Sequence, residues 1–100
     1  MIQATTPTFI LTLPASADLS EATKVVFSAA QEQTLIEKTG TDLTIDGQTV
    51  SVYLTQAETL KLHAGTLKLQ LNWVYADGTR AATDIKSVRV TENLLKKVIS

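Results

Sequence analysis

The stretch Leu67–Arg80, LKLQLNWVYADGTR, carries the strongest pattern in this 100-residue sequence. Leucine or an aromatic residue occupies every odd position from Leu67 to Tyr75, and polar side chains fill the even positions up to Asn72. Such strict alternation is typical of a β-strand with one buried face. Asp77-Gly78 then predicts a tight turn, so we expect this stretch to form an antiparallel hairpin.

Similar runs of alternating or β-branched residues precede and follow this hairpin, and we interpret them as strands. They are Thr8–Leu13, Thr23–Ala29, Gln33–Lys38, a short run at Leu43 and Ile45, Thr49–Leu54, and Ala82–Val90. Proline cannot donate to a strand ladder, so Pro7 and Pro14 predict that the first strand lies at a sheet edge.

Two of these strands carry more detailed predictions. Asp46-Gly47 is a dipeptide that favours a type I′ hairpin turn. In the last strand Ile85 is out of phase with Val88 and Val90, which predicts a β-bulge near Lys86-Ser87.

The alternation breaks at Thr55–Gly65, TQAETLKLHAG, where a helical turn is predicted near residues 56–63. Thr55 followed three residues later by Glu58 is a capping-box pattern, and Gly65 is a candidate for the left-handed residue after a helix. We expect Leu60, with Ala57 as a second candidate, to pack beneath this helix.

About seven short strands with turn signals every 8–12 residues predict an all-β fold, an immunoglobulin-like antiparallel β-sandwich. We assign residues 1–93 to this single domain and residues 94–100 to an apolar C-terminal tail.

The composition argues against several classes of function. A net charge of −1, with no basic run, does not fit a nucleic-acid-binding protein. No apolar run approaches the ~20 residues of a membrane span. The opening MIQATTPTF lacks the features of a secretory signal, so we expect the protein in the cytoplasm, at least until it is assembled into something else.

The sequence also predicts no enzyme, no metal and no cofactor. Without cysteine there can be no disulfide, thiolate zinc site or thiol nucleophile. The one histidine, His63, has no nucleophile motif around it, and turn formation explains Asp46 and Asp77.

Trp73, Tyr75 and Arg80 are the residue types enriched at binding hot spots. The competing interpretation is that Trp73 and Tyr75 extend the leucine face into the core, with Arg80 solvated. We favour the core for Trp73 and keep Tyr75 and Arg80 as secondary interaction candidates.

The tail is the first candidate for an interaction surface. At helical spacing, Leu94, Leu95, Val98 and Ile99 fall on one face of a short helix, with Lys96 and Lys97 outside. This apolar face either folds back onto its own domain or binds a partner.

The block Leu54–Val90 and the opening TPTFILTLP resemble small structural proteins of phage and prophage tail or baseplate modules of Gram-positive bacteria. The pattern is similar to the immunoglobulin-like N-terminal domain of upper baseplate proteins. The shared elements are an early T-P-T-F strand, a V-x-V-x-L-T-Q-x-E-T-L turn, an A-G before an alternating strand, a D-G hairpin and an apolar tail.

The resemblance implies a non-enzymatic virion protein that works by protein–protein assembly with other phage structural proteins or as a homo-oligomer. Upper baseplate proteins continue into a long further region, so the receptor binding of such proteins is not carried over to any residue here. The alternative is a carbohydrate- or receptor-binding module of a phage tail that uses Tyr75, Arg80 and the turn between them.

Overall fold

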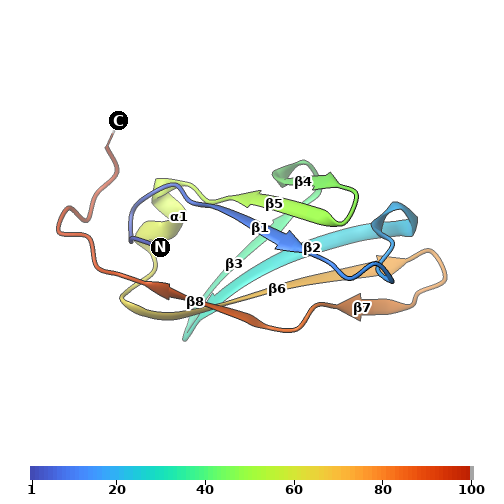
Figure 1. Ribbon diagram of the computed structural model, residues 1–100. Helices are drawn as coiled ribbons and strands as arrows, with labels where there is room; N and C mark the ends of the chain where they lie inside the picture. The colour runs from blue at the N-terminus through green and yellow to red at the C-terminus, as the bar shows by residue number, and fades with distance from the viewer. Residues whose placement is uncertain (100) are drawn as a thin grey trace.

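The computed structural model describes residues 1–99, which form two antiparallel sheets packed face to face (Figure 1). The strands are β1 Thr8–Thr12, β2 Ala22–Gln31, β3 Thr34–Thr39, β4 Leu43–Asp46, β5 Thr49–Tyr53, β6 Gly65–Tyr75, β7 Arg80–Ala82 and β8 Lys86–Val90. One α-helix, α1, spans Gln56–Leu60, and short 3₁₀ turns lie at Leu19–Glu21 and Gly40–Asp42.

The strand order confirms the predicted immunoglobulin-like sandwich. One sheet has the order β1-β5-β4, and the other has the order β3-β2-β6 with β7 and β8 both paired to β6. These correspond to immunoglobulin strands B-E-D and C′-C-F-G, with β7 and β8 as two halves of strand G. The edge position predicted for the first strand is also confirmed, since β1 pairs with β5 alone among residues 1–99.

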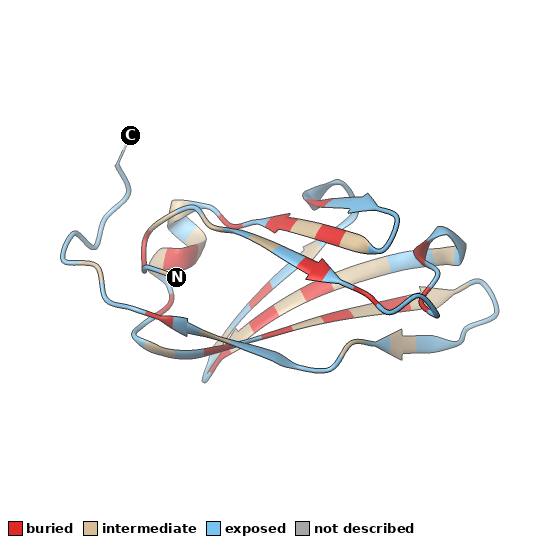
Figure 2. Ribbon diagram, in the orientation of Figure 1, coloured by how far each residue is buried: buried red, intermediate tan, exposed pale blue. Residues whose placement is uncertain are grey.

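The core lies between the two sheets and is built by the predicted alternation. Every odd residue of β6 from Leu67 to Trp73 is buried, and Tyr75 is half-buried at its end (Figure 2). Phe27 of β2 is fully buried and stacks against Phe9 of β1, with the ring centroids 6.5 Å apart. In β3, Ile36 is buried and Leu35 is exposed.

The first residues of the chain join the larger sheet before the chain crosses to the smaller one. Ile2 forms a parallel bridge with Thr91, just beyond β8. The Gln3 amide donates to the Thr91 carbonyl at 2.9 Å, and the Thr91 amide donates to the Met1 carbonyl at 2.8 Å. Residues 1–3 therefore cover the far end of the β8 edge.

The predicted bulge exists, but it lies earlier in the chain than Lys86-Ser87. Asn72 is opposite Ala82, whereas Leu69 is opposite Lys86, so the three residues 83–85 stand opposite only two residues of β6. Thr83 satisfies both backbone groups of Leu71 at the bulge, because its amide donates to the Leu71 carbonyl and its hydroxyl accepts from the Leu71 amide. The bulge divides the last predicted strand into β7 and β8 and leaves Ile85 exposed.

Both Asp-Gly turns occur, but the type I′ prediction for the first is wrong. The loop between Asp46 and Thr49 consists of Gly47 and Gln48, and only Gly47 has a positive φ, of 59°. A type I′ turn needs positive φ at both positions, whereas a positive φ at the first alone is the type II′ pattern. In the second turn Gly78 has φ 89° and donates its amide to the Tyr75 carbonyl at 3.0 Å.

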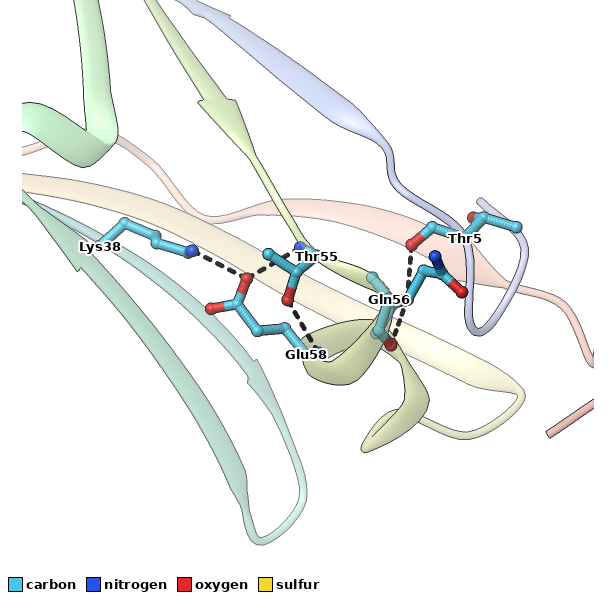
Figure 3. A network of polar contacts seen from close by, with 6 residues as sticks. Thr5, Lys38, Thr55, Gln56 and Glu58 are labelled. Atoms are coloured by element: carbon cyan, nitrogen blue, oxygen red, sulfur yellow. Dashed lines mark hydrogen bonds and ion pairs between the residues drawn. The ribbon is translucent and has the colours of Figure 1, made fainter. Parts of the chain in front are cut away.

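Helix α1 begins as predicted and ends earlier than predicted. The Thr55 side chain accepts from the Glu58 amide, and a Glu58 carboxylate oxygen accepts from the Thr55 amide, which completes the capping box (Figure 3). The helix stops at Leu60, and Gly65 is instead the first residue of β6. No helix in the described residues 1–99 is long and apolar enough to cross a membrane.

The face of α1 that packs inward is also different from the prediction. Leu60 is half-buried and Ala57 is exposed, whereas Thr59 is buried, as is Leu62 just beyond the helix. The Thr59 hydroxyl donates to the Thr5 carbonyl at 2.7 Å, which satisfies a polar group that has no exposure to solvent. This tertiary hydrogen bond turns a polar residue toward the core.

Glu58 also forms an ion pair with Lys38 of β3 at 2.8 Å. Burial alone would raise the pKa of this carboxyl, but hydrogen bonds from Lys38 and from the Thr55 backbone and side chain outweigh it. Together they hold the pKa below its ordinary value of 4.5. A carboxyl whose pKa is lowered by folding stabilises the fold above that ordinary value, and this stabilisation is lost as the pH falls through the folded-state pKa.

We therefore expect Glu58→Gln to flatten the loss of stability below about pH 4.5, because glutamine keeps the capping box but not the charge. At pH 7 the variant should be less stable than the wild type by up to about 1 kcal/mol. Urea unfolding midpoints measured from pH 7 to pH 3 test this. If the urea midpoints of the two proteins fell in parallel between pH 5 and pH 3, the lowered pKa of Glu58 would be contradicted.

Candidate functional site

The C-terminal tail, residues 94–99, holds four of the ten large apolar side chains that are exposed in the described chain. Leu94 is 97% exposed, Ile99 63%, Val98 50% and Leu95 43%. The segment projects beyond the end of β8, next to α1 (Figures 1 and 2). Apolar patches are seldom left bare on monomers unless they contact something else, so the tail keeps its place as the first interaction candidate.

The predicted helical face does not form, because residues 94–99 have no helical structure. A single helix of six residues fixes too many backbone angles for too few hydrogen bonds, and no surface within residues 1–99 packs against it. Both lysines are exposed, as predicted. Lys96 also forms an i,i+4 ion pair with Glu92 at 2.9 Å.

The backbone of the tail is nevertheless held near both of its ends. At the start, the Asn93 side-chain amide donates to the Gln3 carbonyl at 3.0 Å, and the Asn93 side-chain oxygen accepts from the Leu95 amide at 3.0 Å. At the far end, the Gln56 side-chain amide donates to the Ile99 carbonyl at 3.1 Å and accepts from the Ile99 amide at 2.9 Å. The tail thus folds back through its backbone while its apolar side chains remain uncovered.

Gln56 and Asn93 were not anticipated from the sequence. Each is a polar residue beside a loop or helix end, which is ordinary for a solvated side chain. Their partners are backbone groups rather than side chains, and the partner of Gln56 lies 43 residues away. Only the folded arrangement brings these groups together.

Tyr75 lies on the inner side of β6. Its hydroxyl accepts from the Trp73 indole N–H at 2.9 Å, which satisfies the one polar atom of a buried tryptophan side chain. Tyr75 also lines a groove of about 610 Å³ between β1 and β7, together with Leu11, Ala17, Ala81 and Ile85. The interpretation of Trp73 as a core residue is therefore confirmed.

Arg80 lies on the opposite side of the same sheet. It is paired with Val74 across the β6–β7 ladder, and its guanidinium donates to the Asn72 side-chain oxygen at 3.2 and 3.4 Å. Alternate residues of a strand face opposite sides, so Arg80 and Tyr75 cannot reach the same ligand face. The structure does not bring these two candidates together, and it places neither of them beside the tail.

The ionisable groups with shifted pKa values among residues 1–99 lie in a helix cap, a hairpin turn and an ion pair. The pKa of Asp77 is lowered by hydrogen bonds from Thr79 in the hairpin turn, and the pKa of Glu92 is lowered by Lys96. His63 lies 3.4 Å from Glu32, with both side chains largely exposed. No three His, Asp or Glu side chains in the described part of the chain lie close enough to hold a metal ion.

Comparison of the chain with protein-family models, with curated proteins and with solved structures found no match.

Proposed function

We propose that this protein is a non-enzymatic structural component of a phage or prophage tail or baseplate that acts through protein–protein assembly. The observation that carries the proposal is the exposed tail: four large apolar side chains on a backbone that is already hydrogen-bonded to the sandwich. The likeness of the strand and turn pattern to upper baseplate proteins supplies the setting, a virion and its other structural proteins.

The backbone of the tail is already ordered, which lowers the free-energy cost of binding a partner. An ordered segment loses less conformational freedom on association than a disordered one, so more of its interaction free energy remains as affinity. The sandwich has its own closed core and does not need the tail for stability, since the apolar tail side chains contribute little buried surface. A segment that is exposed, apolar and held in place fits a contact with a neighbouring structural protein.

A carbohydrate- or receptor-binding module is the alternative. This alternative requires Tyr75 and Arg80 to contact the same ligand, and these residues face opposite sides of the sheet. We therefore place assembly first.

Deleting residues 94–100 tests the proposal. We expect the truncated protein to keep the thermal unfolding midpoint of the full chain to within a few degrees, because none of residues 94–99 is buried. We expect its incorporation into particles made from the genome that encodes it to fall at least about tenfold, the effect of losing one interface hot spot. Immunoblots of purified particles measure this.

A matched pair of full-length variants separates apolar contact from charge. Replacement of Leu94, Leu95, Val98 and Ile99 by serine should reproduce the deletion, while Lys96→Ala with Lys97→Ala should leave incorporation nearly unchanged. If the serine variant were incorporated into particles at the wild-type level, the tail would be excluded as the assembly contact. Absence of the wild-type protein from purified particles would exclude the virion role itself.

A further inference from the structure

The four edges of the two sheets differ in how they are protected from pairing with another chain. Natural edge strands carry charges, bulges or covering segments that block such pairing. The β3 edge has Glu37 and Lys38, the β4 strand is short and ends at Asp46, and residues 1–3 cover the end of β8. Strand β1, with the sequence TFILT, has no charge, no bulge and no covering segment among the described residues.

The backbone groups of β1 that face its open edge can be identified from its pairing with β5. The Leu13 amide donates to the Gln48 carbonyl at 2.7 Å, and the Pro7 carbonyl accepts from the Leu54 amide at 3.0 Å. In an antiparallel pair, residues that exchange hydrogen bonds alternate with residues that point away. The odd residues of β1 therefore bond to β5, and the N–H and C=O groups of Thr8, Ile10 and Thr12 point outward.

Space is available beside this edge. The groove of about 610 Å³ lies between the C-terminal half of β1, at Leu11 and Thr12, and the segment from Ala81 to Lys86. On the outer face of the sheet, the Ile10 side chain is 62% exposed. An uncharged strand with open backbone groups and an exposed isoleucine at its centre is suited to accept another strand.

The sequence of β1 is complementary to itself when it is read antiparallel about Ile10. Thr8 then lies opposite Thr12 of the other copy, Phe9 opposite Leu11, and Ile10 opposite Ile10. The outward-facing residues fall opposite one another, so the three pairs Thr8–Thr12, Ile10–Ile10 and Thr12–Thr8 can each exchange two hydrogen bonds. Threonine pairs and β-branched pairs are favourable across strands, and no like charges meet.

We propose that two copies of this chain associate through β1, antiparallel and about a two-fold axis at Ile10, so that their smaller sheets join into one six-stranded sheet. A two-fold axis makes the contact self-complementary and closed, which gives a dimer rather than an open filament. This surface is separate from the tail, and the inference does not depend on the proposed function.

Ile10→Lys in the full-length chain is the first test. It places two ammonium groups across from each other at the centre of the contact without changing a buried residue. We expect sedimentation velocity to show a concentration-dependent dimer for the wild type and a dimer dissociation constant raised at least about tenfold in the variant. Leu35→Lys, at an edge position of β3 with 58% exposure, is the matched control and should dimerise like the wild type.

A single cysteine gives a second, geometric test, because the chain has no cysteine of its own. Hydrogen-bonded residues opposite each other in an antiparallel pair have Cα atoms about 5.5 Å apart, which is within the range of a disulfide. Ile10→Cys should therefore form disulfide-linked dimers under mild oxidation, and Leu35→Cys should remain monomeric on non-reducing gels.

Several outcomes would overturn this proposal. They are a wild-type chain that stays monomeric at the highest concentration reached, an Ile10→Lys variant that dimerises like the wild type, and a Leu35→Cys variant that cross-links as fast as Ile10→Cys. Deletion of residues 94–100 should leave the dimer intact. Loss of the dimer on that deletion would assign self-association to the tail and not to β1.

Discussion

Phe27→Ala is expected to lower the free energy of unfolding by about 3–5 kcal/mol, the usual cost of removing a buried phenylalanine side chain. Phe27 has no exposed surface, lies opposite Leu71 in the β2–β6 ladder and stacks on Phe9 of the other sheet. It thus connects the two layers of the sandwich, and its removal leaves a cavity between them. Domains of this size have a total stability of about 5–15 kcal/mol, so the variant should be close to unfolding at 37 °C.

Urea unfolding followed by the fluorescence of Trp73 measures this effect, because this single tryptophan is only 5% exposed in the folded state. The urea midpoint should fall, while the slope of the free energy of unfolding against urea concentration should stay the same. Leu35→Ala is the matched control, since Leu35 is also a large apolar residue of the same sheet but is 58% exposed. The free energy of unfolding of Leu35→Ala should differ from that of the wild type by no more than about 0.5 kcal/mol. Equal losses for the two variants would contradict the central place of Phe27 in the core.

Gln31→Leu is expected to destabilise the protein by about 1–3 kcal/mol, although leucine has nearly the same size and is more apolar. The Gln31 side chain is 4% exposed, donates to the His63 carbonyl at 2.7 Å and accepts from the His63 amide at 2.9 Å. The substitution leaves two partly buried backbone groups without these partners. The loss should also speed hydrogen exchange at the His63 amide, which a change in the core alone would not do selectively.

Gln33→Leu is the control for this prediction, because Gln33 is exposed in the turn between β2 and β3. The same chemical change there should alter stability by no more than about 0.5 kcal/mol. If hydrogen exchange at His63 were unchanged in Gln31→Leu, water would be replacing the glutamine and the side chain would not be fixing this loop.

The parts of the fold that were predicted correctly depend on neighbouring residues in the sequence. Alternation along β6 placed Leu67, Leu69, Leu71 and Trp73 in the core, because a strand exposes alternate side chains on opposite faces. The pair Thr55 and Glu58 predicted the start of α1, because both partners of a capping box lie within one helical turn.

The parts that could not be predicted depend on contacts between distant segments. Gln3 and Gln31 hold the loop at Leu62 and His63, and Thr59 is buried by its hydrogen bond to Thr5. In the sequence these are unremarkable polar residues, since their partners are backbone groups 32 to 59 residues away. The helix predicted for the tail does not form for a related reason. The apolar residues of the tail have helical spacing, but no surface within residues 1–99 packs against them to stabilise a helix.

The parallel pairing of residues 1–3 with the end of β8 has a mechanical consequence. Because the two segments run in the same direction, a tension applied between Met1 and the tail pulls them along each other in opposite senses. The Gln3–Thr91 and Thr91–Met1 hydrogen bonds then carry this shear load at the same time. In an antiparallel pair pulled from one end, the hydrogen bonds would instead break one after another. The contact between the two ends of the chain is thus arranged to withstand stretching of the domain.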